Sequence, residues 1–276
     1  MVTARDVEVG GRVLRVHDSG SGGDAPALVW HHGSPQTGAL LEPVLAAAAR
    51  RDLRVVSYGR PSCGGSTPSP GRDVASAAGD VAAVADALGL SRLAVVGASG
   101  GGPHALACAA LLPDRVLGAV SLAGPAPFTA DFPWYEGMAD EGPLRAARRG
   151  RDARARYVEH DRFDESSFVD TDWAALAGRW APLGEDVGRA AAEGPDGLVD
   201  DDVALAAPWG FDVARVGCPV LLVHGGRDRV VPPSHSDWLL RRCPRAELWV
   251  RPRDGHVAVL DALPVALDWL REVSGA

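Results

Sequence analysis

Short apolar runs alternate with segments of helical spacing along most of the chain. The apolar runs have the length and composition of buried strands, and they cover residues 28–31, 53–57, 93–96, 116–122, 220–223 and 247–250. Between them, helical spacing predicts helices over residues 40–50, 73–88, 103–112, 235–242 and 257–273. This alternation predicts an α/β fold, in which a mostly parallel sheet is covered by helices on both faces. Two alternating runs around Gly10-Gly11 predict a hairpin ahead of the sheet.

The alternation stops after Pro125 and resumes near residue 211. The intervening residues 126–210 contain 18 Asp and Glu against 9 Arg, so this stretch is far more acidic than the rest of the chain. It also contains Trp134, Trp173, Trp180 and Trp209. We therefore predict a helical insertion at 126–210 in a core formed by residues 1–125 and 211–276.

Composition narrows the chemistry that the chain can perform. A net charge of −8 argues against nucleic acid or an anionic membrane surface as the main partner. No apolar run approaches membrane-spanning length, and the N-terminus does not resemble a signal peptide, so we expect a cytoplasmic protein. The four cysteines form no C-x-x-C pair, and we expect no metal or cofactor. All 28 basic residues are arginine, which excludes a Schiff-base lysine, a P-loop lysine and a Ser-Lys dyad.

A candidate nucleophile lies between the predicted strand 93–96 and the helix 103–112. The residues Gly97-Ala98-Ser99-Gly100-Gly101 fit the pattern G-x-S-x-G. A tight strand-to-helix turn would lift the Ser99 hydroxyl clear of the sheet and place it at a helix N-terminus, which favours developing negative charge. Taken alone, the pattern equally fits a glycine-rich loop that only packs a helix against a strand.

A serine hydroxyl needs a histidine base, and that histidine needs a carboxylate to orient it. In open parallel sheets, functional groups gather at the carboxyl ends of the strands. The loop after strand 220–223 contains Asp228, and the loop after strand 247–250 contains His256. Asp254 is a second candidate for the acid, although a residue two positions before a loop histidine is more typical of turn formation.

In this order and spacing, the three loops resemble those of the α/β-hydrolase superfamily, in its cap-bearing serine hydrolase branch. The resemblance covers almost the whole chain, and it implies that Ser99 is the nucleophile, His256 the base and Asp228 the acid. The segment His31-His32-Gly33-Ser34-Pro35 resembles the H-G-x-P loop of the superfamily. By that resemblance, the backbone N–H groups of Ser34 and Gly100 form the oxyanion hole. The insertion at 126–210 is then the helical cap.

One turn departs from the superfamily pattern. Residues 58–67 resemble its D-x-x-G-x-G-x-S turn, but Gly59 stands where an aspartate is usual. We interpret this turn as structural, so the departure affects stability more than catalysis.

We predict that the substrate is a small, partly apolar molecule bound between core and cap. The candidate contacts are His32, Trp134, Trp173, Trp180 and Trp209. The tryptophans fit equally well as the small core of the insertion, and His32 fits better as a hydrogen-bonded residue that organises its loop. Histidines 31, 104 and 224 fit packed positions, and the arginines between 145 and 156 fit a solvated helix face neutralised by its neighbours.

The leading functional hypothesis is a metal-free serine hydrolase that cleaves carboxylic esters or lactones through an acyl-enzyme. Serine at position 99 argues against epoxide hydrolysis and dehalogenation, which in this superfamily use an aspartate. Several activities remain open on the same residues: proline iminopeptidase-like cleavage, carbon–carbon bond hydrolysis, peracid formation and cyclisation without hydrolysis. A ligand-binding receptor built on this scaffold is the alternative from another class. The sequence does not indicate an oligomeric state.

Overall fold

The computed structural model describes residues 1–20 and 26–274, in which eight strands form one sheet in the order β1-β2-β4-β3-β5-β6-β7-β8. The strands are β1 (Thr3–Val9), β2 (Arg12–Asp18), β3 (Ala27–His31), β4 (Val55–Tyr58), β5 (Leu93–Ala98), β6 (Val116–Leu122), β7 (Val220–Gly225) and β8 (Ala246–Arg251). Strands β1 and β2 form the antiparallel hairpin expected around Gly10-Gly11, and β3 to β8 pair in parallel. The predicted α/β fold class is confirmed.

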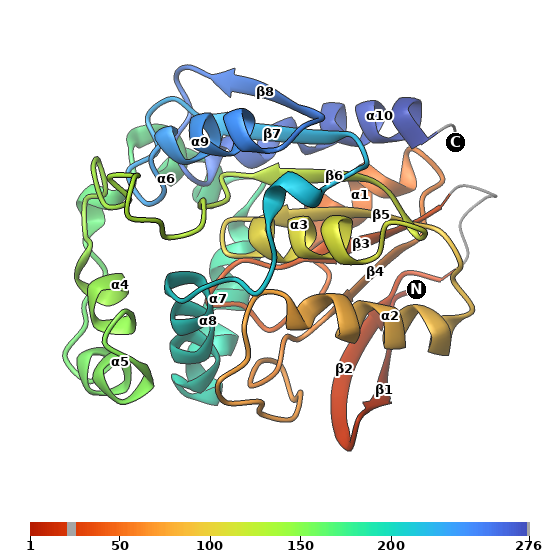
Figure 1. The fold of residues 1–276 in the computed structure, drawn as a ribbon, viewed down its shortest axis with the longest axis horizontal. Helices are drawn as coiled ribbons and strands as arrows, with labels where there is room; N and C mark the ends of the chain where they lie inside the picture. Colours follow the sequence, from red (N-terminus) through yellow and green to blue (C-terminus); the bar gives the residue numbers. More distant parts are fainter. Residues whose placement is uncertain (21–25, 275–276) are drawn as a thin grey trace.

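Helices cover both faces of the sheet (Figure 1). The core helices are α1 (Glu42–Ala49), α2 (Ser76–Leu88), α3 (Gly101–Leu111), α9 (Ser234–Arg242) and α10 (Leu263–Ser274). Side chains of α2, α3 and α9 belong to one hydrophobic core, and those of α1 and α10 belong to a second core on the opposite face. Every residue of β3, β4 and β5 is buried, as expected for central strands of a sheet covered on both sides.

The helix predicted over residues 257–273 is divided into two elements in the structure. The 3-10 turn η3 (Ala258–Ala262) comes first, and α10 starts at Leu263. Pro264 lies at the beginning of α10, where its missing N–H costs nothing and its ring favours helical backbone. Proline at this position therefore starts a new helix, although helical spacing extends across the boundary.

The chain between β6 and β7 contains the helices predicted for the insertion. They are α4 (Gly142–Ala147), α5 (Arg151–Val158), α6 (Asp170–Ala177), α7 (Ala181–Glu193) and α8 (Asp196–Ala206), with the short turns η1 (Glu165–Ser167) and η2 (Val213–Arg215). We call residues 126–210 the cap, and these limits remain a prediction. Helices α4, α5 and α8 pack together, α6 packs on α7, and all five lie at the left of the view in Figure 1. Among the described residues, no helix has the length and apolar character needed to cross a membrane.

Gly59 occupies a position in which a side chain does not fit. A Cβ atom there would lie 2.3 Å from the carbonyl oxygen of Cys63 and 2.8 Å from that of Thr37. Both neighbours are backbone atoms, which cannot move aside as a flexible side chain could. This fold therefore requires glycine at position 59, where the superfamily turn usually has an aspartate.

We expect Gly59→Asp, which restores the superfamily residue, to destabilise the protein by roughly 1–3 kcal/mol or more, because the new side chain overpacks the turn. Gly79→Ala is a suitable control, since its added Cβ on helix α2 meets no described atom within 4 Å. Alanine there should stabilise the fold by about 0.5–1 kcal/mol. Urea unfolding of the three proteins tests this, and a Gly59→Asp variant as stable as the parent would contradict it.

Candidate active site

Ser99 lies at the junction between β5 and α3 with its backbone in the left-handed region, at a φ of 52°. The flanking glycines allow this turn: a Cβ on Gly97 would lie 2.1 Å from the carbonyl oxygen of Gly101, and one on Gly101 would lie 2.1 Å from that of His31. Both interpretations of the glycine-rich pattern are therefore partly correct. The glycines bring helix and strand into close contact, and that contact places the serine in a strained turn.

The structure brings Ser99, His256 and Asp228 together from three loops. His256 Nε2 lies 2.9 Å from Ser99 Oγ, and His256 Nδ1 lies 2.7 Å from Asp228 Oδ2. The second candidate for the acid, Asp254, is bonded instead to the guanidinium of Arg251. This geometry places a base next to a hydroxyl and a carboxylate behind the base.

Asp228 is fully enclosed by hydrogen-bond donors. Its Oδ1 accepts from the backbone N–H groups of Val230 and Val231, both at 2.9 Å. Its Oδ2 faces His256 and also lies 3.4 Å from His224 Nε2. Burial raises the pKa of Asp228, but the two histidines and their hydrogen bonds lower it more, so the net pKa is well below the ordinary value. Asp228 therefore stays ionised at neutral pH.

The same pair sets the protonation of His256. Burial lowers the pKa of His256, but attraction to Asp228, its hydrogen bond to Asp228 and the charge of Asp172 together raise it above the ordinary value of 6.5. A raised pKa means that the site favours the imidazolium, which is the form the base takes after it accepts a proton.

Ser34 and Gly100 line the same cavity as Ser99. Among the described residues, neither the N–H of Ser34 nor that of Gly100 has a hydrogen-bond partner. The two residues are close, because a Cβ on Gly100 would lie 3.0 Å from Ser34 Oγ. His104 Nδ1 donates to the carbonyl oxygen of Gly100 at 2.7 Å, which helps to hold Gly100 in place. The arrangement can accept an oxyanion.

A cavity of about 670 Å³ opens onto Ser99 between the core and the cap. Its wall is largely apolar and includes Trp134, Trp173 and Trp180. Trp180 is anchored by a hydrogen bond from its Nε1 to Asp261 at 3.1 Å, and Trp134 by one to the carbonyl oxygen of Ala126 at 2.7 Å. These three tryptophans occupy positions from which they can contact a bound molecule.

Two predicted substrate contacts need correction, because neither residue lines the cavity. His32 is 1% exposed; its Nε2 accepts from the backbone N–H of Arg60 at 3.2 Å and its Nδ1 donates to the carbonyl oxygen of Gly33. Trp209 is buried against Phe211, with ring centroids 5.7 Å apart, and bonds to the carbonyl oxygen of Leu205. His32 organises its loop, which confirms the interpretation that fitted its position better, and Trp209 packs the base of the cap.

The interpretation of the arginine-rich cap segment as a solvated face also needs correction at one position. Arg154 is 1% exposed and forms part of the cavity wall. Its guanidinium pairs with Asp202 at 2.7 Å and with Asp161 at 3.3 Å. Burial raises the pKa of Asp202 to about 6 despite this pairing. The cavity therefore has a charged region within its apolar wall.

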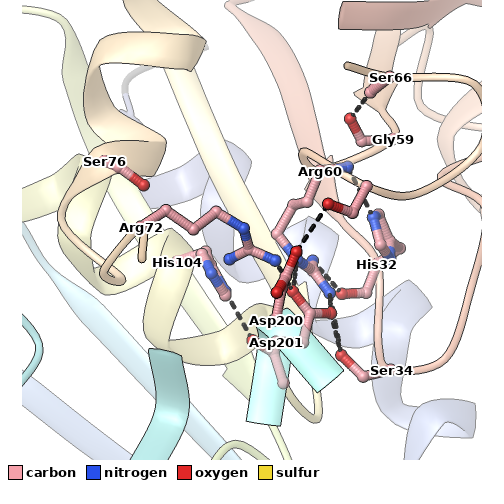
Figure 2. Close-up of polar contacts among 12 residues, drawn as sticks. His32, Ser34, Gly59, Arg60, Ser66, Arg72, Ser76, His104, Asp200 and Asp201 are labelled. Atoms are coloured by element: carbon pink, nitrogen blue, oxygen red, sulfur yellow. Dashed lines mark hydrogen bonds and ion pairs between the residues drawn. The ribbon is translucent and has the colours of Figure 1, made fainter. Parts of the chain in front are cut away.

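Sequence reasoning missed a group of buried ionic residues beside the Ser34 loop. Arg60 and Arg72 both pair with Asp201 of helix α8, and Figure 2 shows the three side chains converging next to Ser34. A buried charge cannot be recognised from local spacing, because Asp201 lies between two other aspartates in an acidic segment. No group of three or more His, Cys, Asp or Glu side chains in the described ranges is arranged to hold a metal ion.

Comparisons with known proteins agree with this fold. A family model described as the alpha/beta hydrolase fold matches residues 26–263. A pimeloyl-[acyl-carrier protein] methyl ester esterase of Neisseria meningitidis is 31% identical over 190 residues, which cover 68% of this chain and 69% of the relative. A putative carbamate hydrolase RutD of a Caulobacter species is 30% identical and covers 90% of each chain. The solved enol-lactonase of Burkholderia xenovorans superimposes with a TM-score of 0.73 at 19% identity, covering 99% of this chain and all of that one, which shows a shared fold.

Fold and site together define an enzyme of the α/β class with a serine, a histidine and an aspartate at the carboxyl ends of its strands. The chain belongs to the α/β-hydrolase fold family.

The pKa of His256 provides a direct test of the site. Asp228→Asn removes the two largest influences that raise this pKa and leaves the lowering effect of burial, so we expect it to fall below that of the parent. Imidazole resonances followed by NMR across the pH range measure the shift. Asp254→Asn is the control, because this nearby carboxylate is bonded to Arg251, and it should leave the pKa of His256 unchanged. An unchanged or higher pKa in Asp228→Asn would contradict the electrostatic account.

Proposed function

We propose that this protein hydrolyses carboxylic esters or lactones through an acyl-enzyme on Ser99. The observation that carries the proposal is the pair of contacts made by His256, 2.9 Å to Ser99 Oγ and 2.7 Å to Asp228 Oδ2. Ester hydrolysis also agrees with the activities of relatives, which include a methyl ester esterase. The fold neighbour that is an enol-lactonase makes lactones a reasonable second form of the same substrate class.

In the first half of the proposed reaction, Ser99 Oγ attacks the substrate carbonyl carbon while His256 Nε2 takes the hydroxyl proton. The carbonyl oxygen becomes an oxyanion that accepts from the N–H groups of Ser34 and Gly100. One such donor typically lowers the barrier by about 3 kcal/mol. The intermediate then collapses, and the leaving alkoxide takes the proton from His256 and departs as the alcohol.

In the second half, water gives a proton to His256 Nε2 and attacks the acyl carbon. Collapse of this second intermediate breaks the bond to Ser99 Oγ, which takes back the proton, and the carboxylic acid leaves. Asp228 stays ionised throughout and stabilises the imidazolium.

Because the base must be neutral to act, we expect kcat/KM to decline as the pH falls through the raised pKa of His256.

The cavity supports a small, partly apolar substrate. Ligand pockets commonly measure about 300–1,000 Å³, so the observed 670 Å³ suits a molecule well above the size of a methyl ester of a short acid.

The carboxylates of the cavity wall do not favour the iminopeptidase alternative. Asp161 and Asp202 already pair with Arg154, and Asp140 and Asp164 accept backbone N–H bonds.

Ser99→Ala is expected to abolish turnover of p-nitrophenyl esters, with kcat/KM reduced by at least about 10³-fold, because the variant lacks the hydroxyl that His256 activates. The parent should be labelled stoichiometrically by a fluorophosphonate probe, and Ser99→Ala should not be labelled. Thermal unfolding provides the control for intact structure. Full activity in Ser99→Ala would remove this serine from the chemistry, and labelling of the parent without turnover of any ester would favour a receptor.

The choice between the two candidate acids can be tested with one matched pair. Asp228→Asn should lower kcat by roughly 10³–10⁴-fold, because the amide favours the wrong histidine tautomer. Asp254→Asn alters an ion pair near the surface, and activity should stay within about threefold of the parent. Steady-state kinetics on one ester decides between them, and the reverse order of effects would reassign the acid.

A further inference from the structure

Helices α6, α7 and α8 of the cap bury aspartates that bond to loops of the core. Asp172 of α6 and Asp186 of α7 are 0% exposed, and Asp201 of α8 is 1% exposed. All three lie outside the cavity wall, so none is placed to contact a bound substrate. The loops that they reach are those that contain His256 and Ser34.

Asp172 holds the His256 loop. Its Oδ1 accepts from the backbone N–H groups of Val257 at 2.7 Å and Ala258 at 2.9 Å, the two residues that follow His256. Its Oδ2 accepts from the N–H of Val169 at 3.0 Å, which fixes the carboxylate to the start of α6. On the other side of His256, a Cβ on Gly255 would lie 2.0 Å from Asp172 Oδ2. The carboxylate therefore packs against the backbone on both sides of the histidine.

Asp186 holds the segment that follows Ser34. It accepts from the backbone N–H of Thr37 at 3.1 Å and from Thr37 Oγ1 at 2.6 Å, and Gln36 Nε2 lies 3.4 Å away. The other end of the same amide, Gln36 Oε1, accepts from the N–H of Gly33 at 2.5 Å. Helix α7 is thus connected by two hydrogen-bonding steps to the residue before Ser34.

Asp201 holds Ser34 directly and also through Arg60. The Ser34 hydroxyl donates to Asp201, and Arg60 donates to Asp201 through Nε at 3.0 Å and Nη2 at 2.5 Å. The same guanidinium donates to the carbonyl oxygens of His32 at 2.6 Å and Gly33 at 3.1 Å. Figure 2 shows this arrangement from the Arg60 side chain to Ser34. Every residue from 32 to 34 therefore has at least one polar group held by the Arg60–Asp201 pair.

We propose that the cap positions the reacting groups of this enzyme, with Asp172 holding the His256 loop and Asp186 and Asp201 holding the oxyanion loop. All three act as positioning residues, since they touch loops and not substrate. Carboxylates suit this purpose because each can accept several bonds from loop N–H groups that would otherwise be buried without partners. The inference rests on the proposed hydrolase function and extends it: cap and core form one catalytic unit, and the cap does more than select substrates.

The test uses the full chain and p-nitrophenyl acetate, which is too small to need the far wall of the cavity. We expect Asp172→Asn, Asp186→Asn and Asp201→Asn each to lower kcat by about ten- to a hundredfold, because displacement of a reacting group by about 1 Å can cost this much. KM for this small ester should stay within about threefold. Asp170→Asn on α6 and Glu185→Gln on α7 are matched controls, since both are exposed and lie one or two residues from the buried aspartates. Both controls should retain the parental kcat.

A second measurement separates positioning from a merely structural role. The charge of Asp172 contributes to the raised pKa of His256, so the acid limb of the pH–rate profile should move to lower pH in Asp172→Asn. If Asp201→Asn or Asp186→Asn does not fold, Ser34→Ala and Thr37→Val remove the loop side of the same contacts with less disturbance, and each should lower kcat with little change in KM. Thermal unfolding and fluorophosphonate titration count the folded sites in every variant.

The outcomes also distinguish this proposal from the one on which it rests. If the parent turns over esters and Ser99→Ala does not, but the folded aspartate variants keep the parental kcat, the cap does not position the site and this inference is wrong. It is equally wrong if the variants change only KM for larger esters. If Ser99→Ala is as active as the parent, the proposed hydrolase mechanism itself fails.

Discussion

The site depends on one steric constraint, the close contact between β5 and the start of α3. With no Cβ at Gly97 or Gly101, the chain turns sharply enough for Ser99 to adopt a φ of 52°. In that turn the hydroxyl lies within hydrogen-bond distance of His256, and Gly100 lines the same cavity as Ser34. A substitution at either glycine would move nucleophile and oxyanion donor together, since both belong to the same turn.

Electrostatics then decides how the residues around Ser99 behave. Asp228 is buried, yet two backbone N–H groups and two histidines keep it ionised, and its charge in turn favours the imidazolium of His256. Some of the acidic residues of the cap also form buried polar contacts. Asp172, Asp186 and Asp201 are buried against loops of the core, where they meet N–H groups, a serine hydroxyl and guanidinium groups. Buried carboxylates are costly without such partners, so these contacts bind cap and core firmly.

Much of the fold could be predicted because its strands and helices follow local periodicity. The observed strand ends differ by no more than two residues from most predicted runs, and Gly89 ends α2 in the left-handed conformation that glycine adopts readily. Spacing alone predicts the final helix as one element, because the spacing continues across the boundary between η3 and α10. Trp209 and His32 are only candidate substrate contacts in the sequence, since an aromatic ring or an imidazole in a loop looks the same whether it faces a cavity or a core.

By itself, the sequence determined the order of strands and helices and the placement of a serine, an aspartate and a histidine in loops that follow strands, because periodicity, glycine turns and chain order are local properties. Only the tertiary structure decided which carboxylate faces His256, which tryptophans line the cavity and which cap aspartates are buried. Those outcomes depend on contacts between residues up to 167 positions apart, such as Ser34 with Asp201. Burial and pairing at such separations arise from packing of whole elements, and no short stretch of sequence contains them.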